Sequence, residues 1–529
     1  METIRLIGRS SRLSLLQIDI AKQLIEQHFP EIKVTVIARS SKGDALQEIP
    51  LHTVEGSDFF TKDIFDALQS GEADIAVHSL KDMSSAHFFG TNLFAVIDRE
   101  DTRDVVIFNN NIEKKIKNGE PIVIGTCSPR REAMATVFLK KALPQLNNNI
   151  NITTTPIRGN VETRLKKLDS GAYDATILAT AGLNRLLKSE SNAVIEGVTV
   201  KQLLANKKLM LLPLIECVPA PCQGAIVAEA NPANKKASAI LNAINNPQLF
   251  ADCYAERIEA IKYGTGCIQK FGVTTLTTQH GLSFYASGTD AEGTQFTHWA
   301  PAPELTLLPQ QVFSSTDVMK KFFSYEWETA ADLATNAPVI FVSNYKAITN
   351  SSAHLLQHKG ATQQLLNSEL KAGNQKIIFA AGTRTWYELA KQGFWVSGCG
   401  DGLGFEFLLP SLAMPLLQII SNDICIITNT AAARRWQQKG YTAISNYELK
   451  TNNDTTIIEN IKKAPAIFWS SYAQFECYGS YANTAAIHLC AGGETASLLK
   501  TSGVEPIIFP TIKSFELWRN SFTRLHNVV

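Results

Sequence analysis

Residues 71–82 read GEADIAVHSLKD, in which a short apolar run follows a glycine and ends in a lysine and an aspartate. The run at 73–77 is mostly apolar, which is typical of a strand buried on both faces of a sheet. Similar runs recur at 122–124 and 175–179, and segments with apolar residues at helical spacing lie between them. This alternation predicts an α/β fold with buried, largely parallel strands over the first 230 residues.

The remaining sequence extends this pattern into further domains. A length of 529 residues suggests about three to five domains. We expect helices from about 231 to 265, then an α+β segment to about 330, with a loop at 304–313. From about 338 the strand–helix alternation returns. Two copies of the order strand, serine, helix, strand, Gly/Thr turn, helix begin at Val339 and Ala466, and they predict two similar α/β lobes.

Composition excludes several classes of protein. Lys and Arg number 50 and Asp and Glu 49, so the net charge of +1 gives no reason to expect a nucleic acid or a membrane as partner. No apolar run reaches about 18 residues, so we expect no transmembrane helix. The N-terminus is polar, and the nine cysteines form no CxxC pair and no zinc spacing, which predicts a cytoplasmic protein with reduced thiols and no metal. P-loop and GxGxxG motifs are absent.

Arginine is concentrated in the first part of the chain, where 11 of the 17 arginines precede residue 190. Five of them are predicted at strand ends or helix starts: Arg9, Arg130, Arg131, Arg158 and Arg185. Ligands of open α/β sheets bind outside the carboxyl ends of the strands, and both helix N-termini and arginines favour anions. The pattern therefore predicts a ligand with several negative groups, and the alternative is a set of ordinary surface arginines.

Two further positions could carry chemistry. Asp82 follows Lys81 at the end of a predicted buried strand, where a carboxylate can accept a hydrogen bond from a cationic N–H or move a proton. The alternative is a capping aspartate beside a surface lysine. Cys267 lies in the loop sequence GTGC, whose small residues leave room for a bulky group on the sulfur. The alternative is a small buried hydrophobic residue.

Taken together, these segments resemble hydroxymethylbilane synthase, also called porphobilinogen deaminase, from about residue 4 to residue 275. The segments that carry the resemblance, in order, are GRSS (8–11), GEADIAVHSLKD (71–82), REDTRD (99–104), GTCSPRR (125–131), RGNVETRL (158–165), LATAGLNR (178–185), QGA (223–225) and GC (266–267). No single segment is specific, but the ordered series is.

The resemblance implies a reaction and a fold. Four porphobilinogen molecules are joined head to tail with loss of ammonia, and the linear product hydroxymethylbilane is released by hydrolysis. A dipyrromethane cofactor, linked by a thioether to Cys267, primes the chain. The acetate and propionate of every porphobilinogen would explain the arginines. The implied fold has two periplasmic-binding-protein-like α/β domains, at 1–100 plus about 224–245 and at 101–223, and a small α+β domain at 246–330 that carries the cysteine.

The resemblance also implies roles for individual residues. Asp82 would be the catalytic carboxylate, which stabilises the cation formed when ammonia leaves. The cofactor-binding residues would be Ser79, Lys81, Thr126, Ser128, Arg130, Arg131, Arg164 and Gln223. The substrate-binding residues would be Arg9, Ser11, Phe60, Arg158 and Arg185. The sequence departs from the family pattern at Ser57 and Asp58, in a lid-like loop that usually has lysine, and at Pro221 and Cys222, where valine and glycine are usual.

Residues 331–529 resemble uroporphyrinogen-III synthase, on the serine turns at 343 and 470–471, the Gly/Thr turns at 382–385 and 492–495, and the segment 444–448. This implies a two-lobed α/β region that cyclises hydroxymethylbilane to uroporphyrinogen III without a cofactor. By position, Tyr447 and Thr495 are the candidates to contact substrate. Two alternatives stay open, namely a deaminase with a non-catalytic C-terminal half and a non-enzymatic anion-binding protein.

Overall fold

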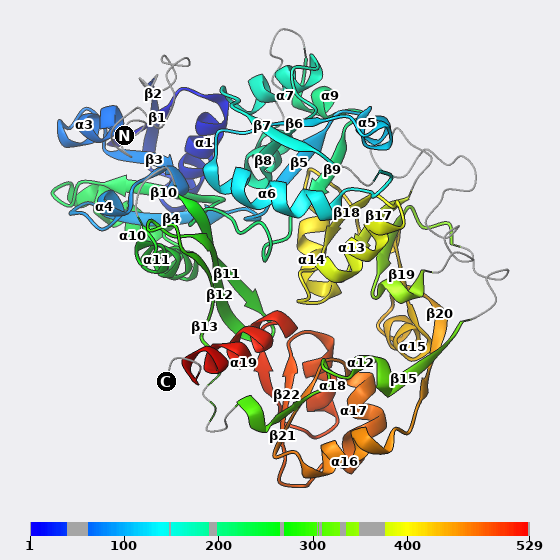
Figure 1. Ribbon diagram of the computed structural model, residues 1–529. Coiled ribbons are helices and arrows are strands. Elements are labelled where there is room, and N and C mark those ends of the chain that lie inside the picture. The colour runs from blue at the N-terminus through cyan, green and yellow to red at the C-terminus, as the bar shows by residue number, and fades with distance from the viewer. Residues whose placement is uncertain are drawn as a thin grey trace.

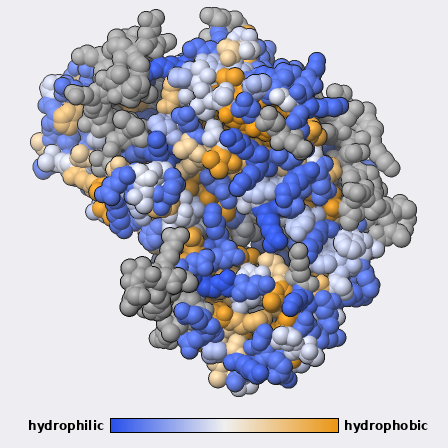
Figure 2. All heavy atoms as spheres, in the orientation of Figure 1, coloured by the Kyte–Doolittle hydropathy of each residue, from blue (hydrophilic) through white to orange (hydrophobic). Residues whose placement is uncertain are grey.

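Within the residues that it describes, the computed structural model contains five β-sheets (Figure 1). It describes residues 2–39, 62–147, 150–189, 198–264, 269–303, 305, 309–327, 335–348 and 376–526. Two five-stranded sheets lie in the upper part of Figure 1, a three-stranded sheet extends down from them, and two further sheets form the right and lower parts. Polar residues predominate on the face seen in Figure 2, with apolar residues in smaller patches between them. Among the described residues, no helix combines the length and apolar character needed to cross a membrane.

The first sheet and its helices form domain 1. Its strand order is β2-β1-β3-β10-β4, and β10 runs antiparallel to both of its neighbours. The strands are β1 (Glu2–Arg9), β2 (Ile32–Arg39), β3 (Ile75–Ser79), β4 (Leu93–Arg99) and β10 (Ala225–Ala230), and the helices are α1 (Arg12–His28), α3 (Lys62–Gln69), α4 (Ser85–Phe88) and α10 (Lys235–Ile244). Apolar residues of α1 and α10 share one core with β1 and β3, and α3 packs on the opposite face.

The second sheet and its helices form domain 2, which repeats the same topology. Its order is β7-β6-β8-β5-β9, with β5 antiparallel to its neighbours. The strands are β5 (Asp104–Phe108), β6 (Ile122–Gly125), β7 (Ile152–Thr155), β8 (Ala175–Ala179) and β9 (Lys208–Leu211), and the helices are α5 (Ile112–Asn118), α6 (Pro129–Ala142), α7 (Val161–Asp169), α8 (Thr180–Lys188) and α9 (Val200–Leu204). The α/β prediction for this part of the chain is confirmed, with one antiparallel strand in each sheet.

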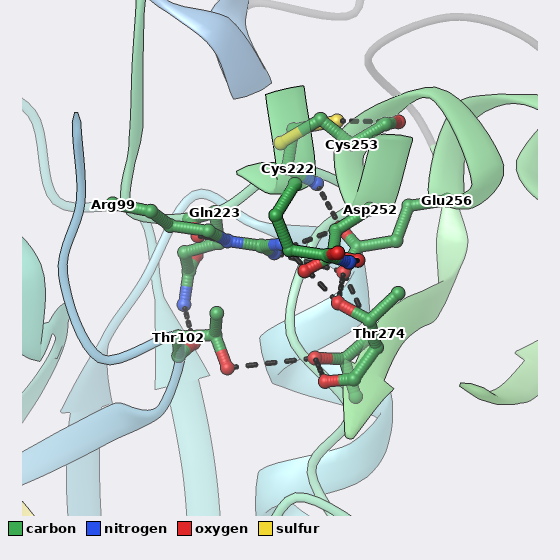
Figure 3. A network of polar contacts seen from close by, with 10 residues as sticks. Arg99, Thr102, Cys222, Gln223, Asp252, Cys253, Glu256 and Thr274 are labelled. Atoms are coloured by element: carbon green, nitrogen blue, oxygen red, sulfur yellow. Dashed lines mark hydrogen bonds and ion pairs between the residues drawn. The ribbon is translucent and has the colours of Figure 1, made fainter. Parts of the chain in front are cut away.

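Two crossing segments join domains 1 and 2, the first between β4 and β5 (99–104) and the second between β9 and β10 (212–224), and the third domain contacts both of them. The third domain consists of α11 (Pro247–Ile261) and the sheet of β11 (Lys270–Thr278), β12 (Gly281–Thr289) and β13 (Gln295–Ala300). The fully buried carboxylate of Glu256 on α11 accepts hydrogen bonds from Arg99 Nη2 at 2.8 Å and from the backbone N–H of Cys222 at 2.6 Å (Figure 3). Cys222 has φ +60°, a conformation that favours glycine.

The last two sheets form two lobes. The first lobe has the order β15-β20-β19-β16-β17-β18 and the second lobe β14-β21-β22-β23. The strands are β14 (Val312–Ser314), β15 (Phe323–Trp327), β16 (Val339–Val342), β17 (Ile377–Ala380), β18 (Val396–Cys399), β19 (Ile424–Asn429), β20 (Thr442–Thr451), β21 (Ala466–Trp469), β22 (Ile487–Ala491) and β23 (Ile507–Phe509). The helices are α12 (Met319–Phe322), α13 (Thr383–Lys391), α14 (Phe405–Leu412), α15 (Thr430–Gln438), α16 (Thr455–Lys463), α17 (Tyr472–Tyr478), α18 (Glu494–Thr501) and α19 (Ile512–His526).

The lobes begin earlier in the chain than the sequence indicated. Strand β14 pairs in parallel with β21 of the second lobe, and β15 pairs antiparallel with the long strand β20. The predicted loop at 304–313 therefore ends in a strand, and residues before 331 belong to these two sheets. The chain enters the second lobe, passes along β15 to the first lobe, and returns along β20.

Domain 2 and the first lobe share a hydrophobic core. The rings of Phe138 on α6 and Trp386 on α13 lie 5.0 Å apart at 84°, and Trp386 Nε1 donates to the carbonyl oxygen of Ala142 at 3.0 Å. Arg103 Nη2 lies 3.3 Å from the buried Asp401 carboxylate. Burial raises the pKa of Asp401 to about 6 although Arg103 opposes the shift. The first lobe is thus packed firmly against domain 2.

Domain 1 contains a buried carboxylate whose effect on stability depends on pH. Glu229 on β10 has no exposed surface and accepts hydrogen bonds from His78 Nε2 at 3.0 Å, His87 Nε2 at 2.7 Å and Asn92 Nδ2 at 2.6 Å. Burial alone would raise the pKa of Glu229, but its histidine partners lower it to about 2. Because this folded-state pKa is below that of the unfolded chain, the stabilisation is complete above about pH 5 and is lost as pH falls toward 2.

We expect Glu229→Gln to be less stable than the natural protein by about 3 kcal/mol near neutral pH. The difference should shrink as pH falls from 5 toward 2, because the Glu229 carboxyl of the unfolded natural chain takes up a proton in this range while the folded carboxyl stays ionised. Urea unfolding followed by circular dichroism at several pH values measures it, with the exposed Glu31→Gln as control. A difference that does not change between pH 3 and pH 7 would contradict the assigned ionisation.

Candidate active site

The turn that follows β3 carries Lys81 and Asp82 toward domain 2. It is a single 3-10 turn, Leu80–Asp82, in which Leu80 is buried and Asp82 is exposed. Burial lowers the pKa of Lys81, the charge of Asp82 raises it, and the charge of Arg131 on α6 lowers it further. The end of a domain 1 strand and the start of a domain 2 helix therefore meet in one charged region.

A buried carboxylate organises the domain 2 side of this region. Asp104, the first residue of β5, has no exposed surface. It accepts hydrogen bonds from Arg130 Nη2 at 2.8 Å, Arg131 Nη2 at 2.7 Å and Gln223 Nε2 at 2.9 Å. Burial would raise the pKa of Asp104, but Arg131 and Arg130 hold it well below its usual value. Asp104 thus orients three side chains that the sequence assigned to cofactor binding.

Sequence reasoning missed the role of Asp104, although this residue closes the segment REDTRD that the resemblance used. The available signal was an acidic residue at the start of an apolar strand, in a chain region rich in arginine. Spacing alone could not pair it with residues 26, 27 and 119 positions away.

The N-terminus of α6 lies in the same charged region. Ser128 is its N-cap and Pro129 is its first residue. The Ser128 hydroxyl accepts from the backbone N–H of Arg131 at 3.4 Å, and the buried Thr126 hydroxyl accepts from the N–H of Ser128 at 3.2 Å. A helix start of this kind carries partial positive charge, which adds to that of the arginines.

Arg164 on α7 adds a further cation. Its Nε donates to the carbonyl oxygen of Gly159 at 2.9 Å. Burial lowers the pKa of Arg164, and the nearby charge of Arg131 lowers it further, while Asp82 opposes both effects. Lys81, Arg131 and Arg164 therefore outnumber the exposed carboxylate of Asp82, and an anionic ligand would relieve their mutual repulsion.

The other predicted side chains of domains 1 and 2 occupy more varied positions. Ser79 exchanges hydrogen bonds with Gln17, and Ser11 is the N-cap of α1. Arg9 is the last residue of β1, and Arg158 lies in the loop after β7. Phe60, Cys267, Ser57 and Asp58 lie outside the described residues.

Arg185 differs from expectation in its position. It lies within α8 rather than at a helix start, it is buried, and its Nη2 donates to Asp98 at 2.7 Å and to the carbonyl oxygen of Gly224 at 2.7 Å. These contacts tie α8 of domain 2 to the end of β4 and to the second crossing segment. Its role in substrate binding stays a prediction.

The two C-terminal candidates lie in different lobes. Tyr447 on β20 is buried in the core shared with domain 2, its ring lies 5.7 Å from that of Tyr325, and burial raises its pKa to about 12. Thr495 is the second residue of α18 in the second lobe and is half-buried. Because Tyr447 is buried and Thr495 keeps some exposed surface, Thr495 is the better placed of the two to contact a substrate.

The residues of the first site fit an anionic group with several carboxylates. Within the described ranges, Arg131 Nε and Gln223 Oε1 are buried side-chain atoms without a hydrogen-bond partner, and a bound polar group would satisfy them. In the same ranges, no three His, Cys, Asp or Glu side chains are grouped so as to hold a metal ion. Lys81, Arg131, Arg164, Ser128 and Gln223 are the side chains that would hold such a group.

Two α/β domains of one topology, with surplus positive charge where they meet, are the arrangement expected of a protein that binds an anionic ligand between its domains. Residues 4–239 match the family model described as porphobilinogen deaminase, dipyromethane cofactor binding domain. The porphobilinogen deaminase of Thiobacillus denitrificans is 35% identical over 268 residues, which cover 50% of this chain and 78% of that protein. The porphobilinogen deaminase of Chromobacterium violaceum is 35% identical over 267 residues, which cover 50% of this chain and 78% of that protein. The chain belongs to the porphobilinogen deaminase family, and its family domain binds dipyrromethane.

Solved structures add little to this assignment. The probable amino-acid ABC transporter extracellular-binding protein ytmK from Bacillus subtilis aligns with a TM-score of 0.27 and 12% identity, over 50% of this chain and 96% of that one. The fold therefore follows from the strand topology of the molecule itself.

Replacing Asp104 by asparagine is expected to lower the fraction of purified protein that carries the cofactor. The amide keeps one acceptor oxygen, so one buried guanidinium loses its partner, at a cost of about 3 kcal/mol in stability. Intact mass gives the occupied fraction, and thermal unfolding gives the change in Tm. Asp174→Asn, which removes the domain 2 carboxylate paired with Lys115, is the control. Full occupancy with an unchanged Tm would contradict the role assigned to Asp104.

Proposed function

We propose that Asp82 is the catalytic carboxylate of the deaminase and that the two C-terminal lobes cyclise its product to uroporphyrinogen III. The first part of this proposal rests on the position of Asp82. It is exposed on the turn after β3, and the cations Lys81 and Arg164 are within electrostatic reach. When bound, the dipyrromethane would supply the pyrrole end to which the first substrate unit is joined.

In this proposal some side chains bind carboxylates and Asp82 takes part in the chemical step. Arg131, Arg164 and the α6 N-terminus bind carboxylates of the cofactor and the growing chain. The carboxylates of the incoming substrate are bound by Arg9, Ser11, Arg158 and Arg185, and Phe60 packs near the pyrroles. As the bond between the aminomethyl carbon and nitrogen breaks, ammonia leaves with the electron pair and positive charge develops on the substrate pyrrole. The Asp82 carboxylate stabilises that charge. After the new carbon–carbon bond forms, a proton leaves the attacked ring, and Asp82 is the nearby group that can accept it.

The cyclase proposal rests on the arrangement of the lobes. Each lobe is an α/β unit, and strands β15 and β20 link them. The two lobes meet where a glycine turn of the first lobe approaches a glycine turn of the second. A side-chain carbon built on Gly404 would lie 3.8 Å from the α-carbon of Gly493. Thr495 is two residues beyond that meeting point. A site where two lobes meet on backbone and Ser/Thr groups suits a substrate that needs positioning rather than a cofactor.

The test supplies hydroxymethylbilane directly to the full-length protein and separates the uroporphyrin isomers formed after oxidation. More isomer III than forms in the absence of protein would support the cyclase. Thr495→Val should reduce the amount of isomer III, and Thr501→Val on the same helix is the control. Tyr447→Phe tests the other candidate. A product mixture identical to that without protein would leave a deaminase with a non-catalytic C-terminal half.

A further inference from the structure

The third domain of the deaminase half reaches the second lobe. The tip of the β11–β12 hairpin lies against the start of α18, where Gln279 Nε2 donates to Ser497 Oγ at 3.0 Å. His280 Nε2 lies 3.2 Å from the carbonyl oxygen of Gly493, so this nitrogen carries the proton. In Figure 1 the green strands of the hairpin extend from α11 down to the red elements of the second lobe.

The same turn also contacts the first lobe. Gly493 has φ +80°, and a side-chain carbon built there would lie 3.3 Å from the carbonyl oxygen of Leu403 in the first lobe. His280, Leu403 and Gly493 all line one small cavity, together with Thr278, Ser283 and Pro510. Hairpin tip, first lobe and second lobe therefore meet at the turn that precedes Thr495.

The Gly493 carbonyl is a shared acceptor at this junction. It accepts from His280 and also from the backbone N–H and the hydroxyl of Ser497, at 3.3 and 3.2 Å. Ser497 is the residue that Gln279 contacts. The two hairpin residues thus bracket the first turn of α18, which carries Thr495.

The opposite end of the third domain contacts the turn that carries Asp82. Arg257 on α11 donates a hydrogen bond from Nη2 to the carbonyl oxygen of Leu80. Cys253 on α11 shares a buried apolar cluster with Leu80 and Met83. One domain therefore touches the backbone of the proposed catalytic turn and, through its hairpin, the start of α18.

We infer that Gln279 and His280 are positioning residues of the C-terminal site, supplied by the deaminase half of the chain. They hold the turn at Gly493 and the first turn of α18 in the orientation that presents Thr495 to the substrate of the C-terminal site. The third domain then connects the two sites, and the C-terminal site is correctly oriented only when it is joined to the deaminase. The catalytic part of this inference rests on the proposed cyclase function, whereas the docking of the hairpin does not.

The experiment compares the full-length double variant Gln279→Ala/His280→Ala with Thr277→Ala, a neighbouring exposed hairpin residue. Hydrogen–deuterium exchange of peptides covering 493–501 should be roughly tenfold faster in the double variant, since two hydrogen bonds to this turn are lost. Ring closure of supplied hydroxymethylbilane should fall by roughly the same factor, with its loss in kcat rather than in KM. Porphobilinogen consumption should not change, which shows that the deaminase remains folded.

A conservative variant completes the test. His280→Gln keeps a donor near the Gly493 carbonyl and should restore most of the exchange protection. Exchange at 493–501 that is equal in the double variant and in Thr277→Ala would overturn the inference. If the double variant exchanges faster but the natural protein does not close the ring, the cyclase proposal and the catalytic part of the inference are wrong. The docking of the hairpin on the second lobe is then still supported.

Discussion

Replacing Cys267 by serine is expected to abolish porphobilinogen consumption. A serine hydroxyl is a far weaker nucleophile than a thiolate at neutral pH, so the primer would have no attachment point. Cys267 follows α11 in the sequence, and the nearest described residues on either side of it are joined by the hydrogen bond from Gln269 Nε2 to the carbonyl oxygen of Gly264 at 3.2 Å. The assay follows loss of porphobilinogen over several hours.

Cys477→Ser is the control for this prediction, because Cys477 is a free thiol that is not fully buried and lies in the second lobe. It should leave the rate unchanged. Turnover by Cys267→Ser at a rate comparable to the natural protein would mean that the primer is attached elsewhere or is not covalent.

Replacing Asp82 by asparagine is expected to reduce kcat by about 10²–10⁴-fold, the range typical of a positioned acid–base or charge-stabilising group. The side chain is exposed, so the fold should be unaffected. Cofactor occupancy should also persist, since Arg131, Arg164 and the α6 N-terminus remain. Steady-state kinetics and intact mass together separate a loss of chemistry from a loss of cofactor.

Asp66→Asn serves as the control for Asp82, because it removes an exposed carboxylate of the same domain. An Asp82→Asn protein with kcat within a fewfold of the natural value would exclude Asp82 from the chemical step. A protein without bound cofactor would show instead that Asp82 acts in assembly.

Local features of the fold could be predicted because their causes are local. Ser128 caps α6 and Pro129 begins it, since both residue types favour those positions whatever lies around them. The apolar run at 73–77 gave β3, followed by the turn with Lys81 and Asp82. The repeated order of strand, serine and glycine turn also corresponds to real strands, β16 and β17 in one lobe and β21 and β22 in the other.

Long-range pairing could not be predicted from the sequence. Val312–Ser314 is too short to show a period, and its partner strand lies about 150 residues later. The antiparallel pairing of β15 with β20 joins segments that are similarly far apart. Because nothing local marks these partners, the sequence placed the start of the two lobes too late in the chain.

The candidate site shows the same division. Of the side chains near Asp82, Lys81 follows a predicted strand and Arg131 starts a predicted helix, whereas Arg164 was named from the family resemblance. Asp104, which orients Arg130, Arg131 and Gln223, was missed because its role depends on three distant partners. Arg185 was expected at a helix start but lies within α8, where it binds Asp98 and Gly224. Tyr447 was a candidate by position, and only packing shows that its hydroxyl lies in a buried core.

The central claim is that this chain builds and carries a covalent dipyrromethane at Cys267, and the intact mass of the purified, denatured protein tests it most directly. We expect a mass greater than that of the sequence by two porphobilinogen units less the ammonia lost in joining them. The Cys267→Ser variant should have the mass of its sequence alone. An unmodified mass for the natural protein, persisting after incubation with porphobilinogen, would contradict the claim.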